Sequence, residues 1–99
     1  MAQVVWTDEA RRWLQDIYDD IAADNEAAAD RTVLAIHKRA ETLLAFPEIG
    51  YRYRERPEVR VLLYGHYRIA YMIAATRDVQ VLGVFHGALD MGRYLASPE

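Results

Sequence analysis

The side chains of this chain that could carry out chemistry are arginines and histidines. Eleven of the twelve basic residues are arginine, and there are three histidines and no cysteine. Guanidinium groups bind carboxylates and phosphates in a fixed planar geometry, so arginine-rich surfaces often hold an anionic partner. Histidine changes its charge near neutral pH and can act as a general acid or base. The available chemistry is therefore anion binding and proton transfer, without a thiolate nucleophile, a thiolate metal site or a disulfide.

The charges are unevenly distributed along the chain. Residues 1–50 hold five basic and ten acidic residues, a net charge of −5, whereas residues 51–99 hold seven arginines and five acidic residues, a net charge of +2. Arg52 and Arg54 could therefore contact an anionic partner. Alternatively, they pair with acidic residues of their own chain, namely Glu48, Glu55 or Glu58, and the sequence leaves both possibilities open.

The three histidines differ in their expected positions. His86 stands at the end of an apolar run, where it could transfer protons or could instead hold the following residues through backbone hydrogen bonds. His66 follows Gly65 in a turn and is expected to be an exposed turn residue. His37 is expected on the outward side of a helix, in contact with solvent.

Other kinds of site have little support. No HxxxH spacing, glycine-rich phosphate loop or GxSxG motif is present, so we expect no metal and no cofactor. Tyr51 and Tyr53 alternate with arginine and could stack on nucleic acid bases. The overall charge of −3 argues against general nucleic-acid binding.

The element that must position these residues is the stretch from Val59 to His86. It is rich in β-branched and aromatic residues, and two turns divide it, one at Gly65-His66 and one at Thr76-Arg77-Asp78. The pattern predicts three consecutive antiparallel strands. A short apolar run at 3–6 is expected to join the same sheet, and residues 51–58 could add a strand with a loose end, since Pro57 disfavours a central strand.

Both faces of this sheet are predicted to be mostly apolar. The middle strand carries Tyr67, Ile69, Tyr71 and Ile73 on one face and Arg68, Ala70, Met72 and Ala74 on the other. Strict alternation in the last strand groups Val79, Val81 and Phe85 against Leu82, Val84 and His86. A sheet with one solvated face shows polar residues at every second position, so each face needs a cover. We expect the chain to cover one face and another molecule to cover the second, and the chain alone to be poorly soluble or dimeric.

Two helices are predicted before the sheet. Thr7 is placed as the N-cap of the first, which carries an apolar stripe and ends near Ala23. Asp24-Asn25 is placed as the start of the second, which ends before Pro47 and Gly50. The stripes comprise Ala10, Trp13, Leu14, Ile17, Tyr18 and Ile21 in the first helix, and Ala29, Val33, Ile36, Ala40 and Leu43 in the second. A short connection makes the pair an antiparallel hairpin, with small residues at 27–29 and 40 allowing close approach.

The predicted order of elements is that of an α+β fold with two layers: an N-terminal strand, an antiparallel helix hairpin, then an antiparallel three-strand meander. Trp6 and Trp13 are expected in its core, and residues 91–96 could form a short helical turn. The length of 99 residues suits a single domain spanning 1–99. No leader sequence or stretch of about 18 apolar residues is present, so we expect a cytoplasmic protein without a membrane segment.

Several motifs in order resemble the ParE/RelE toxin superfamily of bacterial type II toxin-antitoxin systems. They are W-T-x-E-A at 6–10 with L-x-x-I-Y-x-x-I at 14–21, A-D-N-E-A-A-A at 23–29, L-L-x-F-P-x-x-G at 43–50, Y-R-I-x-Y at 67–71 and V-L-G-V-F-H-G-x-x-D at 81–90. Together they cover nearly the whole length. The resemblance implies a small bacterial toxin that an antitoxin encoded beside it neutralises, by folding onto the toxin as a helix or an added strand.

The superfamily divides by target, and the resemblance carries over residue by residue. RelE-like members cut messenger RNA in the ribosome, which requires a base, an acid and positive charge on the phosphate, whereas ParE-like members inhibit DNA gyrase without known catalysis. The family arginine is kept as Arg68. The two basic positions of the preceding strand fall near Val59 and Val61, and the basic position beyond the last strand falls near Gly87. No tyrosine occurs there before Tyr94.

We therefore expect a ParE-like noncatalytic inhibitor of gyrase, with plasmid stabilisation as its biological setting. A RelE-like nuclease using Arg68, His86 and, after a register slip of one, Arg60 is the alternative, and a non-toxic relative that still binds antitoxin is the third. Arg68 is expected to pair with an antitoxin carboxylate, or equally with Asp90. The candidates for antitoxin or target binding are Arg68, Tyr71, Met72, Arg52, Arg54 and His86. The expected partners are the antitoxin and gyrase, or the ribosome and mRNA, in a homodimer or a toxin-antitoxin heterotetramer.

Overall fold

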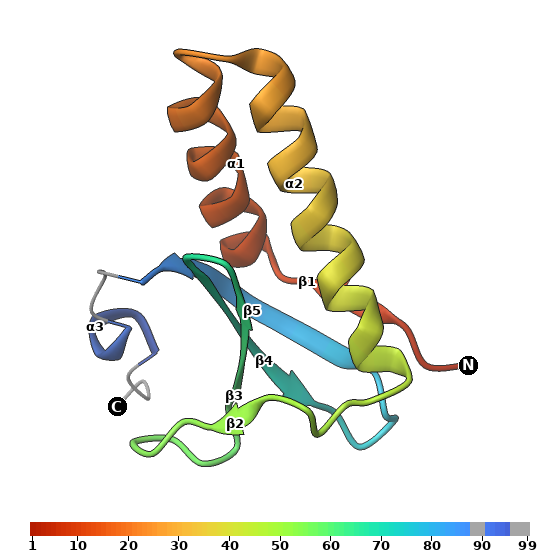
Figure 1. The fold of residues 1–99 in the computed structure, drawn as a ribbon. Helices are drawn as coiled ribbons and strands as arrows, with labels where there is room; N and C mark the ends of the chain where they lie inside the picture. The colour runs from red at the N-terminus through yellow and green to blue at the C-terminus, as the bar shows by residue number, and fades with distance from the viewer. Residues whose placement is uncertain (88–90, 96–99) are drawn as a thin grey trace.

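The computed structural model describes residues 1–87 and 91–95, and these form one five-stranded sheet with two long helices and a short third one (Figure 1). The elements are β1 (Val4–Trp6), α1 (Asp8–Ala22), α2 (Glu26–Glu41), the 3-10 turn η1 (Thr42–Leu44), β2 (Tyr51–Arg52), β3 (Arg60–Tyr64), β4 (Tyr67–Ile73), β5 (Val79–His86) and α3 (Gly92–Leu95). The strand order is β1-β5-β4-β3-β2, in which only β1 and β5 are parallel. The predicted α+β fold is confirmed. Within the described part of the chain, no helix is both long and apolar enough to cross a membrane.

Both helices begin where the sequence places them. The Thr7 hydroxyl accepts a hydrogen bond from the Ala10 amide at 3.1 Å and donates to the Val81 carbonyl at 2.9 Å, so one side chain caps α1 and ties it to β5. Asn25 caps α2 by accepting from the Ala28 amide at 3.0 Å. In Figure 1 the two helices lie side by side and run in opposite directions, which confirms the predicted hairpin.

The helix hairpin covers one face of the sheet. Leu14 of α1 and Ile36 of α2 pack with Ile69 and Tyr71 of β4 in a cluster that also takes in Leu43, Leu62 and the valines of β5. Ala29 and Ala40 are fully buried, as close helix packing requires. Ala27 is exposed, so its predicted place in that contact is wrong.

The alternation along β5 breaks in the middle. Tyr71 pairs with Val81, but the next residue back in β4, Ala70, pairs with Gly83, so Leu82 is an extra residue in β5. A bulge of one residue moves every later side chain of the strand to the face opposite to the one that strict alternation predicts. Val84 consequently joins Val79 and Val81 under the helices, while Phe85 lies on the opposite face. The predicted grouping of Phe85 with Val79 and Val81 is wrong for this reason.

The second face of the sheet is covered by the chain itself. Val59, Val61, Ala70 and Phe85 are at most 1% exposed, and the residues packed with them include Met91 and Leu95 from the C-terminal segment. The expectation that this face needs another molecule is therefore wrong. The predicted turn at 91–96 is α3 (Gly92–Leu95), and Ala96 lies outside the described residues.

Trp13 joins α1 to this second cluster. Its ring meets Phe85 and Tyr94 edge-on, with ring centroids 4.8 Å apart in both pairs. Trp13 is half-buried, and so is Trp6, which packs against the cluster under the helices. Both tryptophans thus border the core, on opposite sides of the sheet.

Candidate hairpin basin and inter-helix pocket

The first candidate site lies at the end of the sheet where β3 turns into β4. It is a concavity of about 350 Å³, called here the hairpin basin, lined by Leu63, Gly65, His66, Tyr67, Arg68, His86 and Gly87. The turn is tight because Gly65 adopts a left-handed conformation with a φ of 56°. The basin therefore combines residues from β3, β4 and the end of β5.

Arg68 and His86, two of the candidate residues named from the sequence, both line the basin. Arg68 is opposite Phe85 in the β4–β5 ladder, and its Nη2 donates to the Gly87 carbonyl at 3.2 Å. The Gly87 amide donates in turn to the His66 carbonyl at 2.7 Å. Two strand ends are thus fixed beside each other. Asp90, the alternative partner predicted for Arg68, lies outside the described residues.

Sequence analysis missed His66 as a member of this site. Its ring is nearly parallel to that of His86, with centroids 6.2 Å apart, and Tyr67 meets the His86 ring edge-on at 6.0 Å. Both histidines are exposed. The turn could have indicated this position, because a two-residue hairpin loop places His66 beside the end of β5, the strand that pairs with Tyr67. Within residues 1–87 and 91–95, no three histidine, aspartate or glutamate side chains gather as metal ligands would.

Arg60 does not belong to the basin. Its register partner in β4 is Tyr71, three residues from Arg68, and its guanidinium donates to the carbonyls of Glu48 and Gly50 at 3.2 and 2.9 Å. Val59 and Val61 are 0% and 1% exposed, so neither presents a group to the basin. Arg60 therefore lies outside the lining of the basin.

Tyr71 is a core residue and cannot contact a partner through its side chain in this structure. It is fully buried, its hydroxyl donates to the Pro47 carbonyl at 2.7 Å, and it accepts from the Gly50 amide at 3.0 Å. A Cβ at position 50 would lie 2.7 Å from the Val61 carbonyl oxygen and from this hydroxyl, so the site requires glycine. Burial raises the pKa of the Tyr71 hydroxyl.

Met72 remains a surface candidate. It lies on the face opposite to Tyr71, half-buried at the border of the cluster that α3 covers, together with Leu82. Of these two binding candidates, Met72 lies on the second face, whereas Tyr71 lies under the helices.

Arg52 and Arg54 are both exposed, and neither forms the predicted pairs with Glu48, Glu55 or Glu58. Arg52 donates to the Pro57 carbonyl at 3.2 Å. Glu58 is instead bound by Arg56 at 2.8 Å, and this hydrogen bond lowers the pKa of the Glu58 carboxyl.

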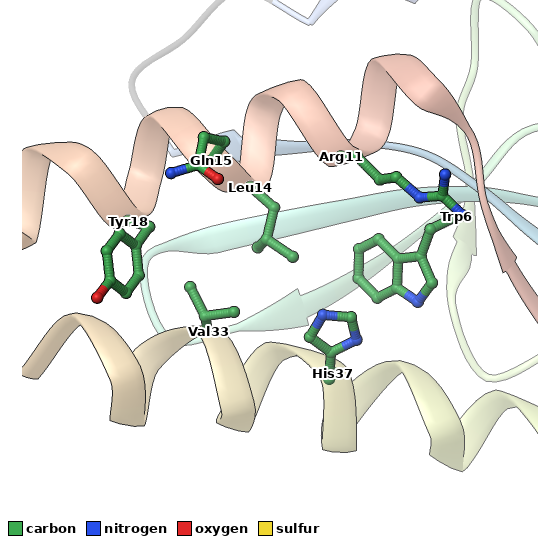
Figure 2. Close-up of a pocket in the computed structure, with 7 residues that line it drawn as sticks. All are labelled: Trp6, Arg11, Leu14, Gln15, Tyr18, Val33 and His37. Carbon is green, nitrogen blue, oxygen red and sulfur yellow. The ribbon is translucent and has the colours of Figure 1, made fainter.

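A second concavity, the inter-helix pocket, lies between α1 and α2. It measures about 450 Å³ and is lined by Trp6, Arg11, Leu14, Gln15, Tyr18, Val33 and His37. Figure 2 shows Leu14 and Val33 pointing toward each other at its middle, with Tyr18 at one end and Trp6 and His37 at the other. The His37 and Trp6 rings are 4.5 Å apart, so the prediction of a solvated, outward His37 is wrong. The signal was its spacing of four residues from Val33 on the inner stripe.

Solved structures resemble this fold closely. One is described as the chromosomal ParDE toxin-antitoxin system from P. aeruginosa, with a TM-score of 0.74 and 22% identity, covering 87% of this chain and 96% of that chain. Another is the toxin-antitoxin complex RelBE2 from Mycobacterium tuberculosis, with a TM-score of 0.67 and 26% identity, covering 86% of this chain and 96% of that chain. No individually curated protein sequence matches this chain significantly. This chain therefore shares its fold with a chain of each of these two toxin-antitoxin systems.

The family is defined by a sequence match over most of the chain. Residues 4–91 match the family described as ParE toxin of type II toxin-antitoxin system, parDE. This chain belongs to the ParE toxin family. The resemblance noted in the sequence is thereby confirmed, and the protein is the toxin component of a type II system.

Proposed function

We propose that this toxin acts by binding DNA gyrase, without catalysing a reaction itself, and that a cognate antitoxin neutralises it. The observation that carries the proposal is that apolar, buried residues occupy the positions where RelE-like nucleases place basic residues. The positions where RelE-like nucleases place basic residues are Val59 and Val61 here, and both are buried beneath the C-terminal segment. The family to which the chain belongs supports the same conclusion.

RNA cleavage requires proton-transferring and charged groups that Val59 and Val61 do not supply. Attack by a 2′-hydroxyl requires a base to take its proton, positive charge on the phosphate and an acid for the leaving oxygen. Arg60, which could have supplied a further cation, is held by two backbone carbonyls. Arg68 would then bind a phosphate without the groups that cleave it.

A ribosome-dependent nuclease is the second candidate, because one specific observation favours it. Arg68, His66 and His86 line one basin, and two histidines can in principle act as base and acid. The lack of charged side chains at Val59 and Val61 makes this candidate the weaker one. A chain that binds antitoxin without being toxic is compatible with the same residues.

The antitoxin is proposed as the principal partner, in keeping with the two toxin-antitoxin systems whose solved structures this fold resembles. We assign its contacts to Arg68 and His86 in the basin and to Met72 at the half-buried border of the second face. Arg52 and Arg54, which are exposed, are assigned to the antitoxin or to the target. A gyrase inhibitor acts in the cytoplasm, where plasmid stabilisation is the corresponding role.

Induction of the toxin in bacteria, with plasmid topology and mRNA 5′ ends read from the same culture, tests this proposal. Growth arrest with relaxed plasmid DNA and unchanged mRNA 5′ ends is the expected result, and co-expression of the neighbouring antitoxin gene restores growth. New 5′ ends within coding regions, with plasmid supercoiling unchanged, would support the nuclease. Growth without arrest would support the non-toxic relative.

A further inference from the structure

The segment between η1 and β2 places two large apolar side chains on the surface. Phe46 is 64% exposed and Ile49 is 51% exposed. Together with Pro47, Glu48 and Arg77 they line a concavity of about 480 Å³, called here the Phe46 patch. In Figure 1 this segment (yellow-green) lies beside the turn between β4 and β5 (light blue), to which Arg77 belongs. Exposed apolar residues rimmed by polar ones mark interaction sites, so the patch is a candidate binding surface.

The backbone of this segment is fixed from the inside of the protein. The Tyr71 hydroxyl donates to the Pro47 carbonyl at 2.7 Å, and the Arg60 guanidinium donates to the Glu48 carbonyl at 3.2 Å. The two apolar side chains of the patch are therefore held at the surface by an anchored backbone. A surface that is already in place loses little conformational entropy when a partner binds it.

Glu48 and Arg77 supply opposite charges to the patch. Both residues are exposed, and within the described part of the chain neither side chain forms an ion pair or a hydrogen bond. Arg77 has a φ of 75°, a left-handed conformation that glycine or asparagine adopts more readily. Its position is nevertheless fixed, because its amide donates to the Ala74 carbonyl at 2.8 Å. Residues in such conformations cluster at binding sites, which supports a binding role for the Arg77 side chain.

A surface with an apolar centre, one anion and one cation is complementary to a copy of itself. In a two-fold dimer every contact occurs twice, so Glu48 can pair with the partner's Arg77 while Arg77 pairs with the partner's Glu48. A polyanion such as a nucleic acid would instead bring negative charge to Glu48. The net charge of −3 on the whole chain also opposes a polyanion and is small enough to permit self-association.

We propose that the Phe46 patch is the interface of a weak homodimer, in which Phe46 and Ile49 of both copies pack together between two Glu48–Arg77 ion pairs. This surface is distinct from the second face of the sheet, which the chain itself covers. Stable dimers bury roughly 800 Å² per partner, more than a patch with two large apolar side chains supplies. The expected dissociation constant is therefore on the order of 100 µM.

The test is analytical ultracentrifugation of the purified toxin from about 5 µM to about 1 mM, a range that brackets this dissociation constant. The mean mass is expected to rise with concentration from the monomer value of 11.4 kDa toward twice that value. Backbone amide NMR signals of the isotopically labelled toxin, recorded over the same range, locate the contact. The amides of residues 46–50 and 75–78 are expected to shift on dilution, whereas those of 26–35 in α2 stay in place.

Charge reversal identifies the groups responsible. Glu48→Arg and Arg77→Glu are each expected to weaken the dimer about tenfold, because like charges then meet at two symmetry-related places. The double variant restores the wild-type affinity, since opposite charges face each other again. Phe46→Ser removes the apolar centre and is expected to leave a monomer throughout the range. Leu34→Ser is the matched control, because Leu34 is 55% exposed on α2 outside the patch, and it leaves the dimer unchanged.

The proposal is overturned by a wild-type toxin that is monomeric at every concentration, or by a dimer that persists in folded Phe46→Ser. A double variant that dimerises no better than the single charge reversals overturns the ion pairs. The amide spectrum of each variant reports whether it is folded, and the charge variants test the proposal independently if Phe46→Ser unfolds. If the wild type is monomeric and Phe46→Ser weakens binding of antitoxin or gyrase, the patch belongs to that partner. Sedimentation of the toxin alone involves neither molecule, so its outcome is separate from that of the proposed function.

Discussion

Arg56 donates through Nη1 to the Leu95 carbonyl at 3.2 Å, joining the loop before β3 to α3. The same guanidinium binds Glu58 through Nε at 2.8 Å. These contacts hold the segment whose Met91 and Leu95 cover Val61, Ala70 and Phe85. One half-buried arginine therefore helps to close the second face of the sheet.

Replacing Arg56 with alanine is expected to lower the free energy of unfolding by about 1 kcal/mol, the usual value of a hydrogen bond to a partly exposed charged group. Urea denaturation measures the change. The matched control is Arg54→Ala, an exposed neighbour that is expected to change stability by less than about 0.5 kcal/mol. Equal stability of the two variants would show that the contact between Arg56 and α3 does not stabilise the fold.

Tyr71→Phe is expected to cost about 1–3 kcal/mol of stability, because the Gly50 amide loses its acceptor inside the protein and the Pro47 carbonyl its donor. Thermal or urea unfolding provides the measurement. Tyr51→Phe, at an exposed position, serves as the control and should be nearly neutral. A neutral Tyr71→Phe variant would contradict the assignment of Tyr71 to a satisfied core hydroxyl.

The same hydroxyl predicts a loss of stability in alkaline solution. Burial raises the pKa of the Tyr71 hydroxyl above its ordinary value of 10.0, so the phenol ionises more readily in the unfolded chain than in the folded one. The hydroxyl of Tyr71 contributes its full stabilisation below pH 10, and that contribution is lost as the pH rises through the folded-state pKa. Wild type should therefore lose more stability than Tyr71→Phe between pH 9 and 11, in urea unfolding. Parallel losses would exclude this linkage.

Glu58 predicts the opposite dependence in acid. The Arg56 hydrogen bond lowers the pKa of the Glu58 carboxyl below its ordinary value of 4.5. The stabilisation from this carboxylate is therefore full above pH 4.5 and is lost as the pH falls through the folded-state pKa. Glu58→Gln should be less stable than wild type at pH 7 and approach it at pH 3. A difference that stays constant with pH would assign the effect to packing rather than charge.

Arg68→Ala is expected to separate toxicity from neutralisation. If Arg68 binds an antitoxin carboxylate, the variant still arrests growth, but co-expressed antitoxin restores growth less well than it does for wild type. Arg31→Ala controls for the loss of one positive charge. Loss of toxicity in a folded Arg68→Ala variant would instead favour a role of Arg68 toward the target or toward RNA.

Much of the fold follows from local signals in the sequence. Thr7 and Asn25 cap their helices as predicted, and Gly65 and Arg77 adopt the left-handed conformations of the two predicted turns, with φ of 56° and 75°. Each of these features is determined by residues that are close together along the chain, so it can be predicted from a single sequence. Arg68 and His86 line the same basin because two consecutive hairpins fix their strands side by side.

The remaining features depend on contacts between distant segments. The bulge at Leu82 moves Phe85 to the second face, and the local signal for it is only the neighbouring Gly83, since an isolated glycine within a strand often marks a bulge. Met91 and Leu95 are separated by Gly92, a weak helix former, so their cover over the sheet arises only from packing on residues such as Val61. The expectation of an uncovered face failed because it counted only the helices as covers.

The most direct test of the central claim is the supercoiling of relaxed plasmid by purified gyrase, measured over increasing concentrations of this toxin. Supercoiling that falls to a plateau with rising toxin, and returns when the cognate antitoxin is added, is the predicted result. Ribosome-bound mRNA in a parallel reaction should stay intact. Full supercoiling at every toxin concentration, with cleavage of that mRNA, would contradict a noncatalytic gyrase inhibitor.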